Sequence, residues 1–129
     1  LKLIIMGLDM YAVKTMADLK GQEVDFSTNN VETEEVAYWR KHPNLHGWME
    51  GLYYDKGGKD DSFNGSCVVL DNEDLDNLEE DIKNGNLPQT AGFFFGQSDG
   101  DEVDGDLEFV KNARQAISEG YKVYYTSWW

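Results

Sequence analysis

Two histidines and a glutamate are spaced as metal ligands on a helix could be. His42 and His46 are four residues apart and Glu50 follows after four more, so a continuous helix would place all three on one side. Pro43 interrupts that helix, because proline lacks the amide hydrogen and clashes with the preceding turn. The spacing also lacks the glutamate of the His-Glu-x-x-His motif. The sequence therefore predicts no metal site, and we expect one surface histidine and one histidine held by a hydrogen bond.

A run of acidic residues and glycines over 99–106 is similar in composition to a calcium-binding loop. Counted from Asp99, Asp101 falls at the third position, but Val103 occupies the fifth and Asp104 the position where the EF-hand requires glycine. We therefore expect a solvated turn and a helix cap, with weak binding of Ca²⁺ or Mg²⁺ as the alternative. The phosphate-loop, dinucleotide-binding and Gly-x-Ser-x-Gly motifs are also missing, so the sequence predicts no cofactor.

The densest group of cationic and aromatic residues runs from Tyr38 to Lys41. Arg40 could bind a carboxylate or phosphate through two parallel hydrogen bonds, with Trp39 or Tyr38 stacked beside it. The alternative is that Arg40 and Lys41 pair with nearby acids and interact with the carboxyl end of a helix.

Several polar residues that stand beside bulky apolar ones are predicted to meet in one partly open pocket. Burying any of them alone would cost roughly a few kcal/mol, so each needs a partner or a wet cleft. The predicted binding residues are Asp9, Arg40, His46 and Thr90, with Tyr38, Trp39 and Trp128 as walls. Arg40 would hold an anion, and His46 would donate or accept a proton near neutral pH. A structural ion pair between Asp9 and Arg40 is the alternative.

The apolar pattern predicts the elements that must position these residues. Strands are predicted where apolar residues alternate or form short runs, over residues 6–15, 66–70, 93–95 and 121–126. Helices are predicted where apolar residues recur every three or four positions after a cap, over residues 30–42, 43–56, 71–84 and 106–119. This order predicts a single α+β domain over residues 1–129, with a small mixed β-sheet covered by about four helices.

The helix that begins at Pro43 has the clearest apolar stripe. It consists of Leu45, Trp48, Met49, Leu52 and Tyr53. We expect this stripe to pack on the first and last strands, and Gly47 and Gly51 to let another backbone approach the other side. The next helix begins with a predicted capping box, formed by Asp71 and Asp74.

The composition is that of one strongly acidic folded domain. The chain has 129 residues, of which 40% are hydrophobic and 13% aromatic, so a core can form without disulfides. The net charge is −14, with seven acids and no base over residues 71–81 and six acids and no base over 99–108. Such a surface repels phosphate backbones, so the sequence predicts no direct binding of nucleic acid.

Cysteine usage and hydropathy add two expectations about the environment. The single cysteine, Cys67, lies in an apolar run and is expected to be buried, which fits a reducing compartment. No run approaches the roughly 18 apolar residues of a membrane span. Residues 1–5 are expected to be an edge strand or an N-terminal extension, because Met6 would make a plausible start.

Five blocks of the sequence resemble a family of small phage and prophage proteins. They are MGLDMY at 6–11, EVAYWRK at 35–41, LHGW at 45–48, LPQTAGFFFG at 87–96 and YYTSW at 124–128. The resemblance implies a phage origin and the cytoplasm of an infected or lysogenic bacterium. It places His46 in a His-x-Trp block of the family and His42 where relatives carry other residues. The family is uncharacterised, so the resemblance implies no activity.

The sequence is compatible with three functions. The first is a phage accessory protein that binds a host protein without catalysis, with mimicry of a polyanion by the helix over 71–84 as one form. The second is an enzyme that handles a small molecule or nucleotide at Asp9, Arg40, His46 and Thr90. The third is a structural part of the virion. The expected partner is a host protein or a small anionic ligand, and the oligomeric state stays open.

Overall fold

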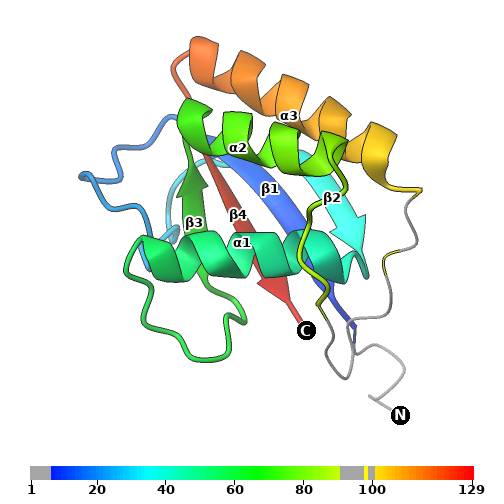
Figure 1. The fold of residues 1–129 in the computed structure, drawn as a ribbon. Helices are drawn as coiled ribbons and strands as arrows, with labels where there is room; N and C mark the ends of the chain where they lie inside the picture. Colours follow the sequence, from blue (N-terminus) through cyan, green and yellow to red (C-terminus); the bar gives the residue numbers. More distant parts are fainter. Residues whose placement is uncertain (1–6, 91–97, 99–100) are drawn as a thin grey trace.

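The computed structural model describes residues 7–90, 98 and 101–129 and forms a sheet with all of its helices on one face (Figure 1). The elements are β1 (Asp9–Thr15), β2 (Glu34–Arg40), α1 (Pro43–Asp55), β3 (Cys67–Leu70), α2 (Asn72–Lys83), α3 (Val103–Ser118) and β4 (Lys122–Trp128). The α+β class is confirmed. The strand predicted over 93–95 lies outside the described residues.

The described sheet has four strands in the order β2-β1-β4-β3, and every neighbouring pair is antiparallel. The prediction of a mixed sheet was therefore wrong, and so was the number of helices, since the described residues form three. The first and last strands lie side by side at the centre. As a result Asp9 faces Arg40 on one side and Trp128 on the other.

The segment predicted as the first helix is instead β2, a strand at one edge of the described sheet. Its side chains alternate between the two faces of the sheet, as a strand requires. Trp39 points toward the helices and packs edge-on against Phe109, with 5.0 Å between the ring centroids. Tyr38 lies on the opposite face beside Tyr11. Pairing with β1 prevails over the helical signal of the acidic residues, because aromatic side chains on a pleated surface pack well against neighbouring strands.

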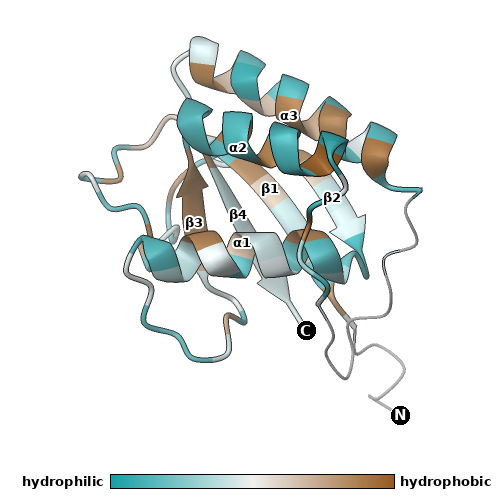
Figure 2. Ribbon diagram, in the orientation of Figure 1, coloured by the Kyte–Doolittle hydropathy of each residue, from teal (hydrophilic) through white to brown (hydrophobic). Residues whose placement is uncertain are grey.

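The main core lies between the sheet and the helices. From α1 it receives Leu45, Met49 and Tyr53, while Trp48 and Leu52 are only partly buried beside it. From β1 it receives Met10 and Ala12, and Leu8, the residue just before β1, also belongs to it. β3 is hydrophobic along its whole length, whereas α2 and α3 carry hydrophilic residues between hydrophobic ones (Figure 2). The predicted inner stripe of α1 is thus confirmed for its fully buried residues, whereas Trp48 and Leu52 lie at the edge of the core.

The sequence predicted the start of α2 correctly but not the start of α3. The capping box of α2 is present: Asp71 accepts a hydrogen bond from the amide of Asp74, and Asp74 accepts one from the amide of Asp71. The prediction that α3 begins at Asp106 was wrong, since the helix begins at Val103. Asp106 is 1% exposed, and its carboxylate binds partners from other elements instead of capping α3.

A second apolar cluster covers one half of the sheet face that has no helices. Leu19 and Phe26, from the irregular segment between β1 and β2, pack on Cys67, Val69 and Tyr124. Burial raises the pKa of the Cys67 thiol to about 11, so this sulfur is protonated at neutral pH. The other half of this face carries Asp9, Tyr38, Arg40 and Trp128.

Candidate functional site

The structure divides the predicted site residues between the two faces of the sheet. Asp9, Tyr38, Arg40 and Trp128 lie together on the face without helices. Trp39 and His46 lie on the helix-covered side, and Thr90 lies against α1. The expected single pocket is therefore not formed. The reason is the pleat, which points successive residues of β2 to opposite faces.

Two adjacent rows of side chains cross the open face. One row joins Arg40, Asp9 and Trp128, and the next joins Tyr38, Tyr11 and Thr126. Arg40 Nη1 lies 2.8 Å from Asp9 Oδ1, and the Tyr38 hydroxyl donates to the same oxygen at 2.7 Å. The structural ion pair between Asp9 and Arg40 is thus present, and the hydrogen bond to Asp9 raises the pKa of Tyr38.

Two of the three aromatic side chains in these rows are exposed although they stand on paired strands. Trp128 is 63% exposed and Tyr38 is 46% exposed. The Trp128 ring rests on the backbone of Gly65, where an added Cβ would lie 3.2 Å from the ring. The rings of Tyr38 and Tyr11 have centroids 5.2 Å apart. We call Asp9, Tyr11, Tyr38, Arg40 and Trp128 the open-face platform.

His46 is buried on the helix-covered side of the sheet, opposite the open-face platform. Its ring is 1% exposed, with a centroid 5.1 Å from that of Phe63 and its Nδ1 atom 2.7 Å from the Tyr125 hydroxyl oxygen. Burial lowers the pKa of His46 to about 4, so the ring is neutral at neutral pH. This lowered pKa gives no support to the predicted role of His46 in proton transfer near neutral pH. The prediction of one surface histidine was wrong, because His42 is 3% exposed.

Thr90 packs against the face of α1 that carries Gly47. A Cβ built on Gly47 would lie 1.9 Å from Thr90 Oγ1, so only glycine admits this approach. The Thr90 amide also donates to Asn44 Oδ1 at 3.1 Å. The prediction that another backbone approaches Gly47 and Gly51 was wrong: the side chain of Thr90 lies against Gly47, and nothing lies within 4 Å of a Cβ on Gly51.

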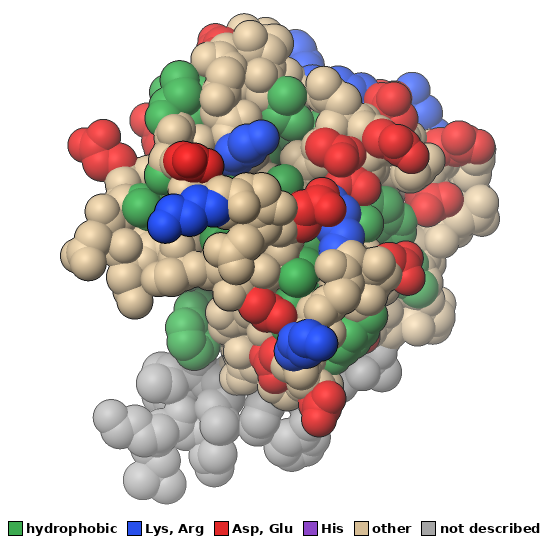
Figure 3. Space-filling view, turned by 90° about the vertical axis from the view of Figure 1, so that its left-hand side faces the viewer, with side chains coloured by type: hydrophobic (Ala, Val, Ile, Leu, Met, Phe, Trp, Pro, Cys, Tyr) green, Lys and Arg blue, Asp and Glu red, His purple; other side chains and the backbone are tan. Residues whose placement is uncertain are grey.

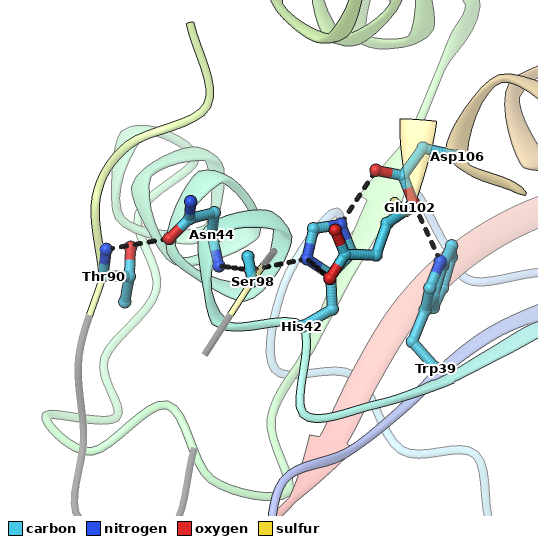
Figure 4. A network of polar contacts seen from close by, with 7 residues as sticks. All are labelled: Trp39, His42, Asn44, Thr90, Ser98, Glu102 and Asp106. Carbon is cyan, nitrogen blue, oxygen red and sulfur yellow. Dashed lines mark hydrogen bonds and ion pairs between the residues drawn. The ribbon is translucent and has the colours of Figure 1, made fainter. Parts of the chain in front are cut away.

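A second polar cluster brings Trp39 of β2 and the residues at the start of α1 together with Ser98 and the first turn of α3 (Figure 4). His42 Nε2 lies 2.8 Å from Asp106 Oδ2, and His42 Nδ1 lies 2.8 Å from Ser98 Oγ. The Trp39 indole donates to the other oxygen of Asp106 at 3.1 Å. The amide of Asn44 donates to Ser98 Oγ at 3.1 Å. We call Ser98, His42 and Asp106 the serine–histidine–aspartate chain.

The direction of each hydrogen bond in this chain depends on which nitrogen of His42 carries a proton. An ionised carboxylate can only accept, so the proton between His42 and Asp106 belongs to Nε2. In the neutral ring Nδ1 is then an acceptor, and Ser98 donates its hydroxyl proton to it. A hydroxyl hydrogen-bonded to an imidazole, which is oriented in turn by a buried carboxylate, is the arrangement of an activated nucleophile.

The serine–histidine–aspartate chain lies beside a pocket of about 170 Å³. Apolar walls come from Ile82, Leu87 and Val103, and Glu102 adds an acid whose Oε2 lies 3.8 Å from His42 Nδ1. Sequence reasoning missed this site because residues 42, 98 and 106 follow no motif. The resemblance also pointed away from His42.

The acidic segment over 71–81 is largely occupied with structural contacts. Five of its seven acids bind other groups of the chain: Asp71 in the cap of α2, Asp74 with Lys56, Asp76 and Glu79 with Arg114, and Asp81 with Trp48. On the side of the molecule shown in Figure 3, acidic side chains are interleaved with Lys and Arg. The charge therefore serves the packing of α2 as well as solvation.

The described part of the chain offers no group of three or more His, Cys, Asp or Glu side chains that could hold a metal ion. Its helices are also too short or too polar to cross a membrane. Comparison of the chain with protein-family models, with curated proteins and with solved structures finds no match.

Proposed function

We propose that this chain is a small accessory protein that binds another protein through its open-face platform. The observation that carries the proposal is the exposure of Trp128 and Tyr38, at 63% and 46%, on paired strands of a sheet. Tryptophan, tyrosine and arginine are the residues in which binding energy concentrates at protein interfaces. The platform presents all three types within two adjacent rows.

The platform is held in place before any partner arrives, which reduces the entropy lost on binding. Asp9 fixes the guanidinium of Arg40 and the hydroxyl of Tyr38. Gly7 gives the guanidinium room, because a Cβ there would lie 2.8 Å from Arg40 Nη2. Arg40 retains donors for a carboxylate or carbonyl of the partner.

The resemblance to phage proteins suggests which partner to look for. We infer a protein of the host bacterium, met in the host cytoplasm. Mimicry of a polyanion by α2 has weaker support, because five of the seven acids over 71–81 bind groups within the chain. The enzyme at Asp9, Arg40, His46 and Thr90 is not proposed, since the fold separates these side chains.

The test compares capture of bacterial lysate proteins by the wild-type chain and by a Trp128→Ala, Tyr38→Ala double variant. A protein captured only by the wild type is then purified and titrated by calorimetry. We expect a loss of affinity of at least about 30-fold in the double variant, equivalent to about 2 kcal/mol at such contact positions.

Met16→Ala is the matched control, because Met16 is 62% exposed and lies near Gly120, away from the platform. Equal affinity of the wild type and the double variant, with both folded, would refute the platform as the binding site.

A further inference from the structure

We propose that Ser98 is an acylatable nucleophile and that the serine–histidine–aspartate chain hydrolyses small esters. This activity does not depend on the open-face platform. It rests on two 2.8 Å contacts, Ser98 Oγ to His42 Nδ1 and His42 Nε2 to Asp106 Oδ2, beside a pocket of about 170 Å³ (Figure 4).

The fold buries the imidazole of His42 and the carboxylate of Asp106 away from water. His42 is 3% exposed and Asp106 is 1% exposed. A buried carboxylate must have donors, and Asp106 has them on both oxygens, from the Trp39 indole and from His42. These bonds fix the tautomer and the orientation of the imidazole. The serine is only half-buried and lines the pocket, so a substrate can reach its Oγ atom.

The ring nitrogens have exchanged the roles they take in the serine proteases. There the carboxylate binds Nδ1 and the serine faces Nε2. Here Asp106 binds Nε2, so Nδ1 faces Ser98. Either nitrogen serves as a base, because neutral imidazole carries one donor and one acceptor.

The reaction balances with water as the only co-reactant. Ser98 Oγ attacks the ester carbonyl carbon, its proton passes to His42 Nδ1, and the carbonyl π electrons move to oxygen. The tetrahedral intermediate collapses, the bond to the alkoxide breaks, and His42 returns the proton to the departing alcohol. Water then attacks acyl-Ser98 in the same way, releasing the carboxylic acid and restoring the serine. Asp106 stabilises the imidazolium that forms in each half.

The amino end of α1 lies beside the reacting atoms. The amide of Asn44 is 3.1 Å from Ser98 Oγ and belongs to the first turn of this 13-residue helix. The positive end of the helix dipole favours the negative charge that develops on the carbonyl oxygen. The same amide contact also makes Ser98 a cap for α1, which is the purely structural role that the experiment must distinguish.

The pocket defines the class of substrate. Its volume of about 170 Å³ suits an acyl group of a few carbons. Ile82, Leu87 and Val103 give it apolar walls. Glu102, close to His42, disfavours an anionic substrate. A short, uncharged acyl ester fits these conditions.

A fluorophosphonate probe, which phosphonylates activated serines, tests the proposal directly. The full chain is incubated with the probe, and intact mass and peptide mapping report the adduct. We expect one adduct per chain, at Ser98, and none in Ser98→Ala. Hydrolysis of p-nitrophenyl acetate should fall to background in the same variant. Ser118→Ala is the control, since this exposed serine is bound only within α3.

The role of the base is tested with His42→Gln and Asp106→Asn. Each should slow labelling of Ser98 by about 100-fold or more, the usual contribution of a general base. Because His42→Gln can fail to fold, Asp106→Asn, which keeps the shape of the side chain, provides the second measurement. Absence of a Ser98 adduct in the folded wild type would overturn the proposal. Labelling at the wild-type rate in a folded His42→Gln or Asp106→Asn variant would overturn it as well.

Discussion

Acidification from pH 7.5 to 4.5 is expected to weaken the fold through His46. This ring lies between Phe63 and Tyr125, is 1% exposed, and has its pKa lowered by burial from 6.5 to about 4. Between pH 6.5 and about 4, His46 is therefore mostly protonated in the unfolded chain and mostly neutral in the folded chain. The contribution is fully present above pH 6.5 and is lost as the pH falls toward 4.

The size of the effect follows from the two pKa values. One pH unit inside this window changes the free energy of unfolding by up to about 1.4 kcal/mol. With pKa values of 6.5 unfolded and about 4 folded, the loss between pH 7.5 and 4.5 is about 2.5 kcal/mol. That is a large part of the 5–15 kcal/mol that typically stabilises a domain.

Urea melts of the wild type and of His46→Gln at pH 7.5, 6.5, 5.5 and 4.5 measure this contribution. Glutamine retains a polar partner for the Tyr125 hydroxyl but does not titrate, and the acids of the chain affect both proteins alike. We expect the stability difference between the two proteins to shrink by about 2.5 kcal/mol from pH 7.5 to 4.5. Parallel pH profiles, or an NMR titration of His46 with a midpoint above pH 6, would refute the reasoning.

Three further predictions concern packing, capping and the thiol. Gly47→Ala should destabilise the protein by about 1–3 kcal/mol, because the added Cβ would meet Thr90. Gly51→Ala is the control: nothing lies within 4 Å of its Cβ, so it should be neutral or stabilise the protein by up to about 1 kcal/mol. Equal melting curves for the two variants would contradict this prediction. Asp71→Ala removes the cap of α2 and should cost about 1 kcal/mol in urea melts, and an unchanged midpoint would count against the capping box. Cys67, with its pKa raised to about 11, should react with a thiol reagent at pH 8 only after unfolding, and rapid reaction of the native protein would show that the sulfur is accessible.

The sequence alone located the elements whose signals are local. Pro43 and the apolar spacing after it predicted α1, and Asp71 with Asp74 predicted the start of α2. Alternating or short apolar runs predicted β1, β3 and β4. These signals depend on neighbouring residues of one segment, so they can be seen without knowing where the segment packs.

Only the tertiary structure decided which side chains meet. Glu34–Arg40 became a strand because β1 lies beside it, and that pairing put Arg40 and Trp39 on opposite faces. The expected pocket divided for this reason, while Asp9, Arg40 and Trp128 came together through the register of three strands. Such outcomes depend on contacts between residues far apart in the chain, and no local pattern encodes them.

The serine–histidine–aspartate chain is the clearest case of this limit. Ser98 and Asp106 lie 56 and 64 residues from His42, and the helix signal had assigned Asp106 to a cap. The sequence shows that all three residues are polar, and a polar residue must find partners when it is buried. The packing of α1 and α3 on the same face of the sheet decided which partners they find. Burial removes water as a hydrogen-bond partner, so each buried polar group must use the donors and acceptors that the fold brings within reach.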